Sequence, residues 1–267
     1  MEIKKLHLLF FTPTHTTRDC LRNIAKGIVS DGTIKDVEFH NLTLPPAREK
    51  EIEIPEDELL LVGMPVYAGR VPGMFQAGLP VKGRGAAVCA VVYGNRDYDD
   101  ALIELVSLTS ASGFRVAAAG AFIAQHSLNP LMAAGRPDYR DAQAQMGFGK
   151  DILRKIGECD APGDIATVGV RGNSDYKPYS PAMLVPQLIA DKCISCRICA
   201  GACPTQVISH DDFTVVDPAG CIMCNACVTF CPRKARDLPE PQKSLFGEKM
   251  RKLQEANSMR KEPELFI

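Results

Sequence analysis

Residues 192–204 read KCISCRICAGACP, and residues 220–232 repeat the pattern as GCIMCNACVTFCP. The second stretch is shifted by 28 residues, and its four cysteines and its proline coincide with those of the first. Eight of the 11 cysteines of the chain lie in these two runs. Cysteines so close in sequence do not join distant segments as disulfides, so both runs are predicted to bind metal.

The spacing of the cysteines distinguishes two kinds of metal site. Structural zinc commonly binds two cysteine pairs separated by a longer loop. The run C-x2-C-x2-C-x3-C-P is instead typical of bacterial ferredoxins, in which three close thiolates bind one 4Fe-4S cluster and the fourth cysteine reaches the other cluster. The sequence therefore favours two 4Fe-4S clusters over zinc.

Residues 187–236 resemble a bacterial two-cluster ferredoxin over both motifs. The resemblance implies a small α+β domain in which the two runs exchange their last ligands. It assigns one cluster to Cys193, Cys196, Cys199 and Cys231, and the other to Cys221, Cys224, Cys227 and Cys203. Between the runs, residues 207–220 predict two short strands around a turn at His210.

The composition limits the other classes of function. The chain has 267 residues, of which 46% are hydrophobic, which is enough for an α/β core and a second small domain. Its formal net charge is -1 and no long run of one sign occurs, which argues against a nucleic-acid partner. No apolar stretch is long enough for a membrane helix, and the start lacks a signal-peptide cleavage site, so we expect a cytoplasmic protein.

The first 170 residues alternate between two patterns. Short apolar runs predict strands at residues 6–11, 59–63, 86–93 and 116–123, and a weaker strand is predicted within residues 34–42. Helical spacing occurs at residues 20–28, 102–108 and 139–156. This alternation predicts an α/β domain with a doubly wound, five-stranded parallel sheet. Ligands of such sheets bind at the carboxyl ends of the strands, so we examine the loops that follow each strand.

The loop after the first strand is rich in hydroxyl groups. It reads FTPTHTTRD and contains no G-x-G-x-x-G, which argues against a dinucleotide of the usual type. Amides at a helix start and neighbouring hydroxyls can bind phosphate oxygens, here at Thr12, Thr14, Thr16 and Thr17. The alternative is that Thr16 or Thr17 only caps the helix.

This loop resembles the phosphate loop of flavodoxins, and two further loops stand where that family binds the flavin ring. The resemblance implies FMN as cofactor. His15 occupies a position at which flavodoxins usually carry glycine, and it either donates to the phosphate or signals a looser loop. The remaining flavin contacts implied by the resemblance are Pro65, Val66, Tyr67, Ala68 and Gly69 after the third strand, and Tyr93, Gly94, Asn95, Arg96 and Tyr98 after the fourth. His126, after the fifth strand, is either a contact to the flavin or substrate, or an ordinary loop residue.

The chain as a whole resembles the flavodoxin-fused ferredoxins found mostly in anaerobes. The implied organisation is a flavodoxin-like domain at residues 1–170, a linker at 171–186, a ferredoxin domain at 187–236 and a tail at 237–267 that contains a helix. The linker is long enough to swing or to lie across the flavin.

Two functions fit this organisation. The favoured one is an electron carrier or oxidoreductase component that passes low-potential electrons between FMN, two 4Fe-4S clusters and a partner protein. The alternative is an FMN-dependent reductase of a small organic substrate that takes its electrons through the clusters. No catalytic residue is identified, and a homodimer stays open.

Overall fold

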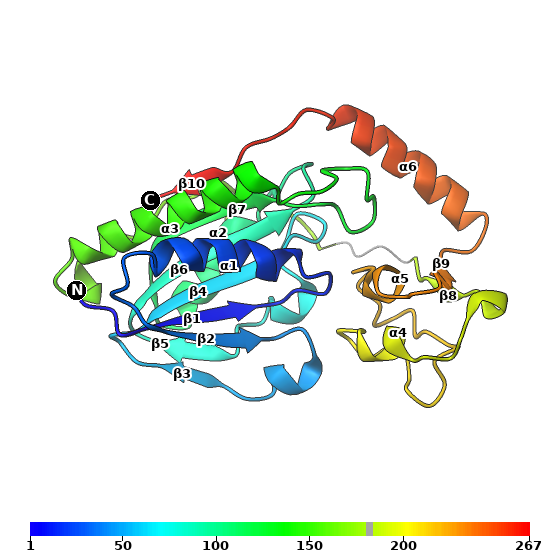
Figure 1. Cartoon of the computed structure of the whole chain (residues 1–267), viewed down its shortest axis with the longest axis horizontal. Helices are drawn as coiled ribbons and strands as arrows, with labels where there is room; N and C mark the ends of the chain where they lie inside the picture. Colours follow the sequence, from blue (N-terminus) through cyan, green and yellow to red (C-terminus); the bar gives the residue numbers. More distant parts are fainter. Residues whose placement is uncertain (180–183) are drawn as a thin grey trace.

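The protein is described by a computed structural model covering residues 1–179 and 184–267. Its largest feature is a six-stranded sheet in the order β10-β7-β6-β4-β1-β2 (Figure 1). Five strands are parallel: β1 (Lys5–Phe10), β2 (Asp36–Asn41), β4 (Leu59–Pro65), β6 (Ala86–Tyr93) and β7 (Arg115–Ile123). Counted alone they run 2-1-3-4-5 across the sheet, which is the flavodoxin-like order. The predicted parallel sheet is confirmed.

Helices cover both faces of this sheet. Helices α1 (Thr16–Ile28) and α3 (Tyr139–Gly157) lie side by side on one face, and α2 (Ala101–Ala111) covers the other (Figure 1). The central strands β4 and β6 are buried almost throughout because both of their faces are covered. This explains why they read as continuous apolar runs rather than as alternating ones.

Two glycines allow α1 and α3 to approach each other closely. A Cβ added to Gly149 would lie 2.2 Å from the carbonyl oxygen of Ile24, and one added to Gly27 would lie 2.1 Å from that of Met146. Both distances are to backbone atoms, which cannot rotate away. The absence of side chains at these two positions therefore sets the distance between the helices.

Gly149→Ala is expected to destabilise the protein by about 1–3 kcal/mol, because the new methyl group would force the helices apart. Gly147→Ala, in the same helix, is the matched control: no atom lies within 4 Å of its added Cβ. The control should stabilise by about 0.5–1 kcal/mol through the lower entropy of the unfolded chain. Denaturant midpoints of both variants check the prediction, and equal shifts would contradict it.

The connection from β4 to β6 contains no α-helix. It contains β5 (Val81–Gly83), which pairs in parallel with β3 (Ile52–Ile54) as a separate two-stranded ribbon. Short 3-10 helices complete the irregular connections: η1 (Pro45–Arg48), η2 (Gly73–Phe75), η3 (Pro162–Asp164) and η4 (Ala190–Lys192).

Residues 187–237, called here the cysteine-rich segment, lie beyond the carboxyl ends of the parallel strands (Figure 1). Strands β8 (Gln187–Leu188) and β9 (Arg236–Asp237) pair antiparallel and join the two ends of the segment. Helices α4 (Ile198–Gly201) and α5 (Ala226–Thr229) are related by the 28-residue shift of the sequence repeat. The same shift relates three pairs of residues with left-handed backbone: Ser195 and Met223, Arg197 and Asn225, and Gln206 and Lys234. The sequence repeat is therefore a repeat of backbone structure.

The predicted hairpin between the runs is not formed as regular strands. Residues 207–217 are turns and bends, with one backbone bond from the Asp217 amide to the Val207 carbonyl at 3.0 Å. The side chains of Ser209 and Asp212 accept the amides of this loop. Short polar side chains thus replace the strand ladder.

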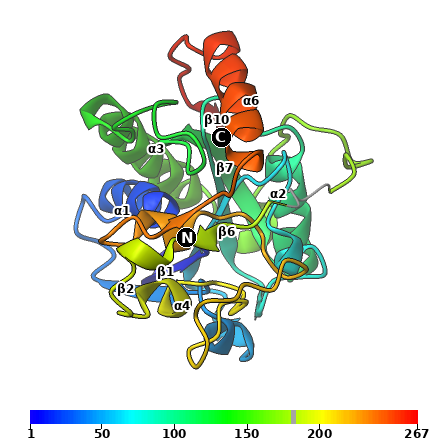
Figure 2. The same ribbon diagram turned by 90° about the vertical axis from the view of Figure 1, so that its right-hand side faces the viewer.

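The tail contains a strand as well as the predicted helix. Helix α6 (Gln242–Ala256) is followed by β10 (Glu264–Phe266), which pairs antiparallel with β7 as the sixth strand of the sheet. Figure 2, which faces the cysteine-rich segment, shows α6 above it. The tail therefore returns to the first domain, and the cysteine-rich segment is attached at both ends.

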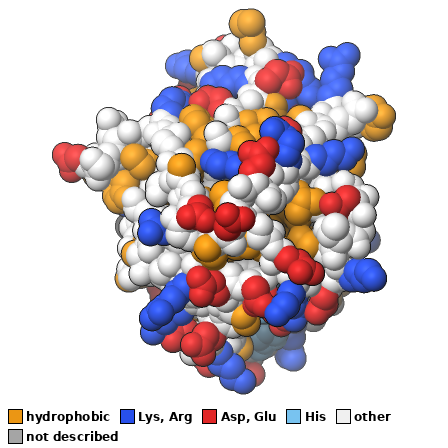
Figure 3. All heavy atoms as spheres, turned by 90° about the vertical axis from the view of Figure 1, so that its left-hand side faces the viewer, with side chains coloured by type: hydrophobic (Ala, Val, Ile, Leu, Met, Phe, Trp, Pro, Cys, Tyr) orange, Lys and Arg blue, Asp and Glu red, His pale blue; other side chains and the backbone are white. Residues whose placement is uncertain are grey.

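The opposite side of the molecule, where both termini lie, carries basic and acidic side chains intermingled with apolar ones (Figure 3). A hollow of about 770 Å³ lies at the amino terminus and is lined by Ile3, the loop 30–35 and the end of α3. No cysteine or predicted flavin loop borders it. Among residues 1–179 and 184–267, no helix is long and apolar enough to cross a membrane.

Candidate functional site

A cavity of about 290 Å³ lies at the carboxyl ends of the parallel strands. Its walls come from the loops after β1, β4, β6 and β7, from the linker, from the second cysteine run and from α6. The lining residues are Thr14, Thr16, Pro65, Val66, Tyr67, Ala68, Val92, Tyr93, Gly94, Ala124, Gln125, His126, Ser127, Leu128, Tyr179, Ile222, Met223 and Lys249. This is the edge at which parallel sheets bind their ligands.

The threonine loop contributes two of its four hydroxyls to the cavity, those of Thr14 and Thr16. Thr17 is buried in the first turn of α1, and Thr12 is buried with its Oγ1 accepting the Arg18 amide at 3.2 Å. Thr12 therefore has the capping role that the alternative interpretation gave to Thr16 or Thr17. The backbone amides of Thr14, Thr16 and Thr17 have no acceptor among residues 1–179 and 184–267. They remain available to an anion.

His15 has the left-handed backbone that glycine adopts most readily, with φ at 72°. Its ring packs on Phe230 at 4.7 Å between centroids and does not line the cavity. Burial lowers the pKa of His15, with a further contribution from Arg18. The side chain thus contacts the cysteine-rich segment, and the prediction that it binds phosphate has no support in this geometry.

The loop after β4 lines the cavity with Pro65–Ala68, whereas Gly69 does not. A Cβ on Gly69 would collide with the Asp99 side chain, and its carbonyl accepts the Asp100 amide at 3.0 Å. Gly69 therefore has a structural role in the turn. Burial raises the pKa of Tyr67, and the nearby thiol of Cys224 adds to the shift.

The loop after β6 lines the cavity with Tyr93 and Gly94, but three predicted flavin contacts point elsewhere. Asn95 donates from Nδ2 to the carbonyls of Asn257 and Met259, at 2.8 and 2.9 Å. Arg96 forms an ion pair with Asp99, and the Tyr98 hydroxyl donates to Glu264 at 2.6 Å. These three side chains are engaged by the tail or by their own loop, and none of them lines the cavity.

Several cavity residues were missed or left undecided by the sequence. Tyr179 comes from the linker and Lys249 from α6, and no local pattern marks either as part of a site. The histidine left undecided, His126, lines the cavity. Its Nδ1 accepts the amides of Leu128 and Asn129 at 3.1 and 3.3 Å, and burial lowers its pKa. The neutral ring therefore carries its proton on Nε2 and acts as a donor there.

A buried ion pair holds the loop after β4. Arg70 donates from Nε and Nη2 to the Glu104 carboxylate at 2.8 and 2.5 Å, and the Val71 amide donates to the same group. Arg70 also donates to the carbonyl of Lys177 in the linker at 2.5 Å. The Arg70 side chain thus joins the loop after β4, α2 and the linker.

The eight clustered cysteines form two groups. Cys193, Cys196, Cys199 and Cys231 surround one small void of about 20 Å³. In the other group, burial raises the pKa of Cys224, and the thiols of Cys227, Cys203 and Cys221 add to the shift. Cys203 therefore lies beside the second run, as the ferredoxin resemblance implies. Burial likewise raises the pKa of Cys227 to about 12, so a metal must displace thiol protons when it binds.

Residues 192–235 match the 4Fe-4S dicluster domain family. This segment is a 4Fe-4S dicluster domain. The two predicted clusters are thereby confirmed, and their residues fit: four thiols line one void, the other four lie near one another, and left-handed residues stand at matched positions of both runs. Such turns direct backbone amides toward an anion.

Two relatives match part of the chain. Archaeal-type glutamate synthase (NADPH) of Dehalococcoides mccartyi is 36% identical over 62 residues, which are 22% of this chain and 12% of that protein. An uncharacterized protein from the rpl9-rpl11 intergenic region of Porphyra purpurea is 32% identical over 66 residues, 22% of this chain and 88% of its own length. Both likenesses cover less than a quarter of this chain.

Solved flavodoxins resemble the sheet domain. One from the domain Archaea covers 58% of this chain and 99% of its own, with 16% identity and a TM-score of 0.38. The flavodoxin of Megasphaera elsdenii covers 56% and 98%, with 12% identity and a TM-score of 0.35. The strand order, rather than these likenesses, defines the flavodoxin-like fold of the sheet domain, the part of the chain that contains β1 to β7.

The dicluster domain contacts the sheet domain through its second run and its first proline. Asn225 donates to the Ser127 carbonyl at 2.7 Å, and Arg48 donates to the Pro204 carbonyl at 2.7 Å. Ile222 and Met223, between the first two cysteines of the second run, line the cavity. In the first run, by contrast, Cys196 and Ile194 are exposed. The two cluster sites therefore face different surroundings, one the cavity and one the solvent.

Proposed function

We propose that this protein is an iron-sulfur flavoprotein that passes low-potential electrons between FMN, its two 4Fe-4S clusters and a redox partner protein. A single observation carries the proposal: residues of the second cysteine run line the same cavity as the predicted flavin loops. FMN exchanges one or two electrons, whereas a 4Fe-4S cluster exchanges one. A shared cavity is the arrangement that a direct relay needs.

The polarity of the cavity walls supports FMN as the ligand. The hydroxyls of Thr14 and Thr16 and the unpaired amides of their loop suit the phosphate, because a helix start favours an anion. Tyr67, Tyr93 and Tyr179 supply aromatic surface for the ring, in a chain without tryptophan. Lys249 adds a positive charge at the rim. These groups bind and orient the flavin, and the tyrosines exclude water.

The different surroundings of the clusters suggest a direction for the relay. Cys221, Cys224, Cys227 and Cys203 bind the cluster beside the cavity. Cys193, Cys196, Cys199 and Cys231 bind the other, where Ile194 and Cys196 are exposed. The partner docks on this second side, and the protein conducts between that surface and the flavin.

The cofactor content tests the proposal. Protein prepared anaerobically should contain about eight iron and eight acid-labile sulfide, as two cubane clusters require, together with one equivalent of FMN. Metal, sulfide and flavin analysis of one sample gives all three values. Zinc without sulfide, or clusters without FMN, would contradict the proposal. Turnover of a small organic substrate at the flavin would instead favour the reductase.

The threonine loop gives a test of the FMN orientation. Thr14→Ala and Thr16→Ala should each weaken FMN by about 1 kcal/mol while leaving riboflavin nearly unchanged, because only FMN has phosphate oxygens for the lost hydroxyls. Thr33→Ala, in an exposed turn outside the cavity lining, is the control and should leave both affinities unchanged. Flavin fluorescence titration measures them. Equal weakening of both ligands would show that the loop is only a helix start.

A further inference from the structure

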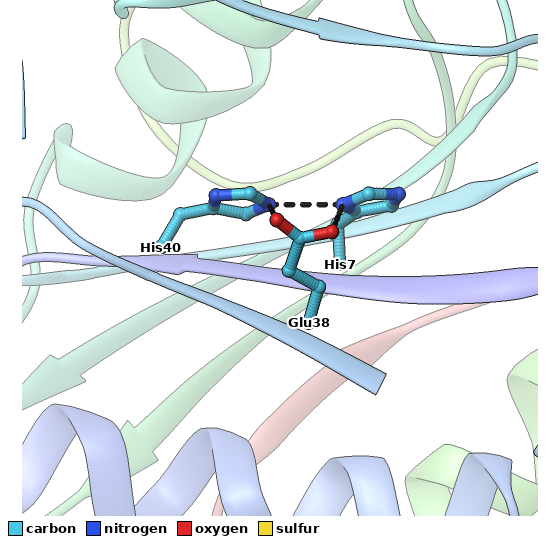
Figure 4. Close-up of side chains that lie close together, drawn as sticks. All are labelled: His7, Glu38 and His40. Atoms are coloured by element: carbon cyan, nitrogen blue, oxygen red, sulfur yellow. Dashed lines mark hydrogen bonds and ion pairs between the residues drawn. The ribbon is translucent and has the colours of Figure 1, made fainter. Parts of the chain in front are cut away.

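Three polar side chains lie close together on the edge strand β2 and its neighbour β1, apart from the redox site (Figure 4). His7 lies on β1, and Glu38 and His40 lie on β2. The parallel register places His7 opposite Glu38, and residues two apart on a strand share one face. All three side chains therefore project to the same side. His7 precedes the threonine loop by five residues, so the group lies roughly 16 Å along the strand from the flavin cavity.

The nitrogen and oxygen atoms of this group converge. His7 Nδ1 lies 2.9 Å from His40 Nε2. The Glu38 carboxylate lies 3.9 Å from His7 Nδ1 and 3.8 Å from His40 Nε2. All three ligand atoms lie within 4.8 Å of one another. His7 is buried and His40 is half-buried, whereas Glu38 is exposed and its carboxylate can move.

A fourth residue decides which nitrogen of His7 is available. Glu58, just before β4, bonds His7 Nε2, so that nitrogen carries the proton. The lone pair of Nδ1 then points at His40. A carboxylate behind an imidazole is the arrangement that fixes the tautomer of metal-binding histidines and increases their basicity.

We propose that His7 Nδ1, His40 Nε2 and the Glu38 carboxylate bind a divalent transition-metal ion, with Zn²⁺ as the best match. Two imidazoles and one carboxylate are typical zinc ligands, and water takes the fourth position. Tetrahedral zinc needs its nitrogens about 3.3 Å apart, so the rings must separate by a few tenths of an ångström and Glu38 must swing inward. The ion would join β2, a largely exposed edge strand, to β1.

Lys5 provides a specific signature of such a site. Its Nζ forms an ion pair with Glu38 at 2.5 Å, so it competes with any cation for this carboxylate. Without metal, the two rings satisfy each other by one hydrogen bond, and Lys5 neutralises Glu38. A metal site therefore predicts tighter zinc binding when the lysine is removed, whereas a simple hydrogen-bonded pair predicts no change.

The test uses the full chain with both clusters assembled under anaerobic conditions, so that iron already occupies the clustered cysteines. Zn²⁺ is titrated, its stoichiometry is measured by elemental analysis, and X-ray absorption identifies its ligand atoms. We expect one additional zinc bound by nitrogen and oxygen, and a higher melting temperature of the protein.

The variants separate this site from adventitious binding. His40→Gln and Glu38→Gln should weaken zinc by about 100-fold or more, and Glu58→Gln by about 10-fold to 100-fold. Lys5→Met should tighten it on the order of fivefold, since a nearby positive charge is lost. His210→Gln, at an exposed turn of the dicluster domain, is the control and should change nothing. A sulfur ligand shell, unchanged binding in His40→Gln, or no zinc beyond the clusters would overturn the proposal.

Discussion

Cys224→Ala is expected to abolish electron exchange between the flavin and the clusters within one molecule. Its cluster is the one beside the cavity, because Ile222 and Met223 of the same run line the cavity wall and the Cys224 thiol lies near Tyr67. Iron content should fall from about eight to about four per chain, as loss of one cubane requires. FMN should stay bound, since most of the residues that line the cavity belong to the sheet domain.

Rapid mixing at low protein concentration measures this exchange. In the unmodified protein, flavin reduced by a one-electron donor should equilibrate with the clusters at a rate independent of protein concentration, because the linker, the tail strand β10 and the contacts of Asn225 and Arg48 hold the two domains together.

Cys193→Ala is the matched control for Cys224→Ala, because it also removes one ligand and about half of the iron. Its cluster faces solvent, so the fast exchange with the flavin should survive while reduction by an external partner protein slows. If Cys193→Ala abolished the flavin phase and Cys224→Ala spared it, the proposed order of the relay would be wrong. A rate that scales with protein concentration would contradict an intramolecular relay altogether.

Glu104→Ala is expected to cost about 3–5 kcal/mol of stability, the cost of leaving a buried charge without its partner. The carboxylate is almost fully buried, and it accepts two bonds from Arg70 and one from the Val71 amide. Without Glu104, Arg70 no longer fixes the loop that carries Tyr67, nor the linker at Lys177. Weaker FMN binding should therefore accompany the loss of stability.

The denaturant midpoint, followed by far-UV circular dichroism under anaerobic conditions, measures the change. Glu255→Ala is the control, because its ion pair with Arg251 is exposed on both sides and its loss should cost at most about 0.5 kcal/mol. Glu104→Gln, which keeps the shape and some of the hydrogen bonds, should fall between the two. Similar midpoints for Glu104→Ala and Glu255→Ala would show that the buried pair does not stabilise the fold.

The parallel strands could be predicted from sequence because burial on both faces leaves a local mark. The apolar run at residues 86–93, for example, is β6 without change. The tail strand β10 could not be predicted: its three residues carry no period, and they become a strand only because β7 presents an unpaired edge. Likewise, residues 207–217 favour strands locally, but side-chain bonds from Ser209 and Asp212 hold them as turns.

The candidate site likewise contains residues that local sequence predicts and residues whose position depends on long-range contacts. Thr14, Thr16, Tyr67 and Tyr93 could be assigned to the cavity from their positions directly after parallel strands, because such loops must meet at one edge of the sheet. The Asn95 side chain does not line the cavity, because its amide group donates to carbonyls that lie 162 and 164 residues further along the chain. Such long-range pairings depend on where the tail returns, which no window of sequence contains.

The sequence by itself determined the two cluster sites and the parallel strands, because the spacing of thiols along a short run and the continuity of apolar residues are local properties of the chain. It made the two cysteine runs equivalent, since they repeat each other. Only the tertiary structure decided that the second run faces the cavity lined by the predicted flavin loops, whereas Cys196 and Ile194 of the first run are exposed. The contacts of Asn225 with Ser127, of Arg48 with Pro204 and of His15 with Phe230 join residues 98 to 215 positions apart in the sequence, and they exist only after both domains have folded.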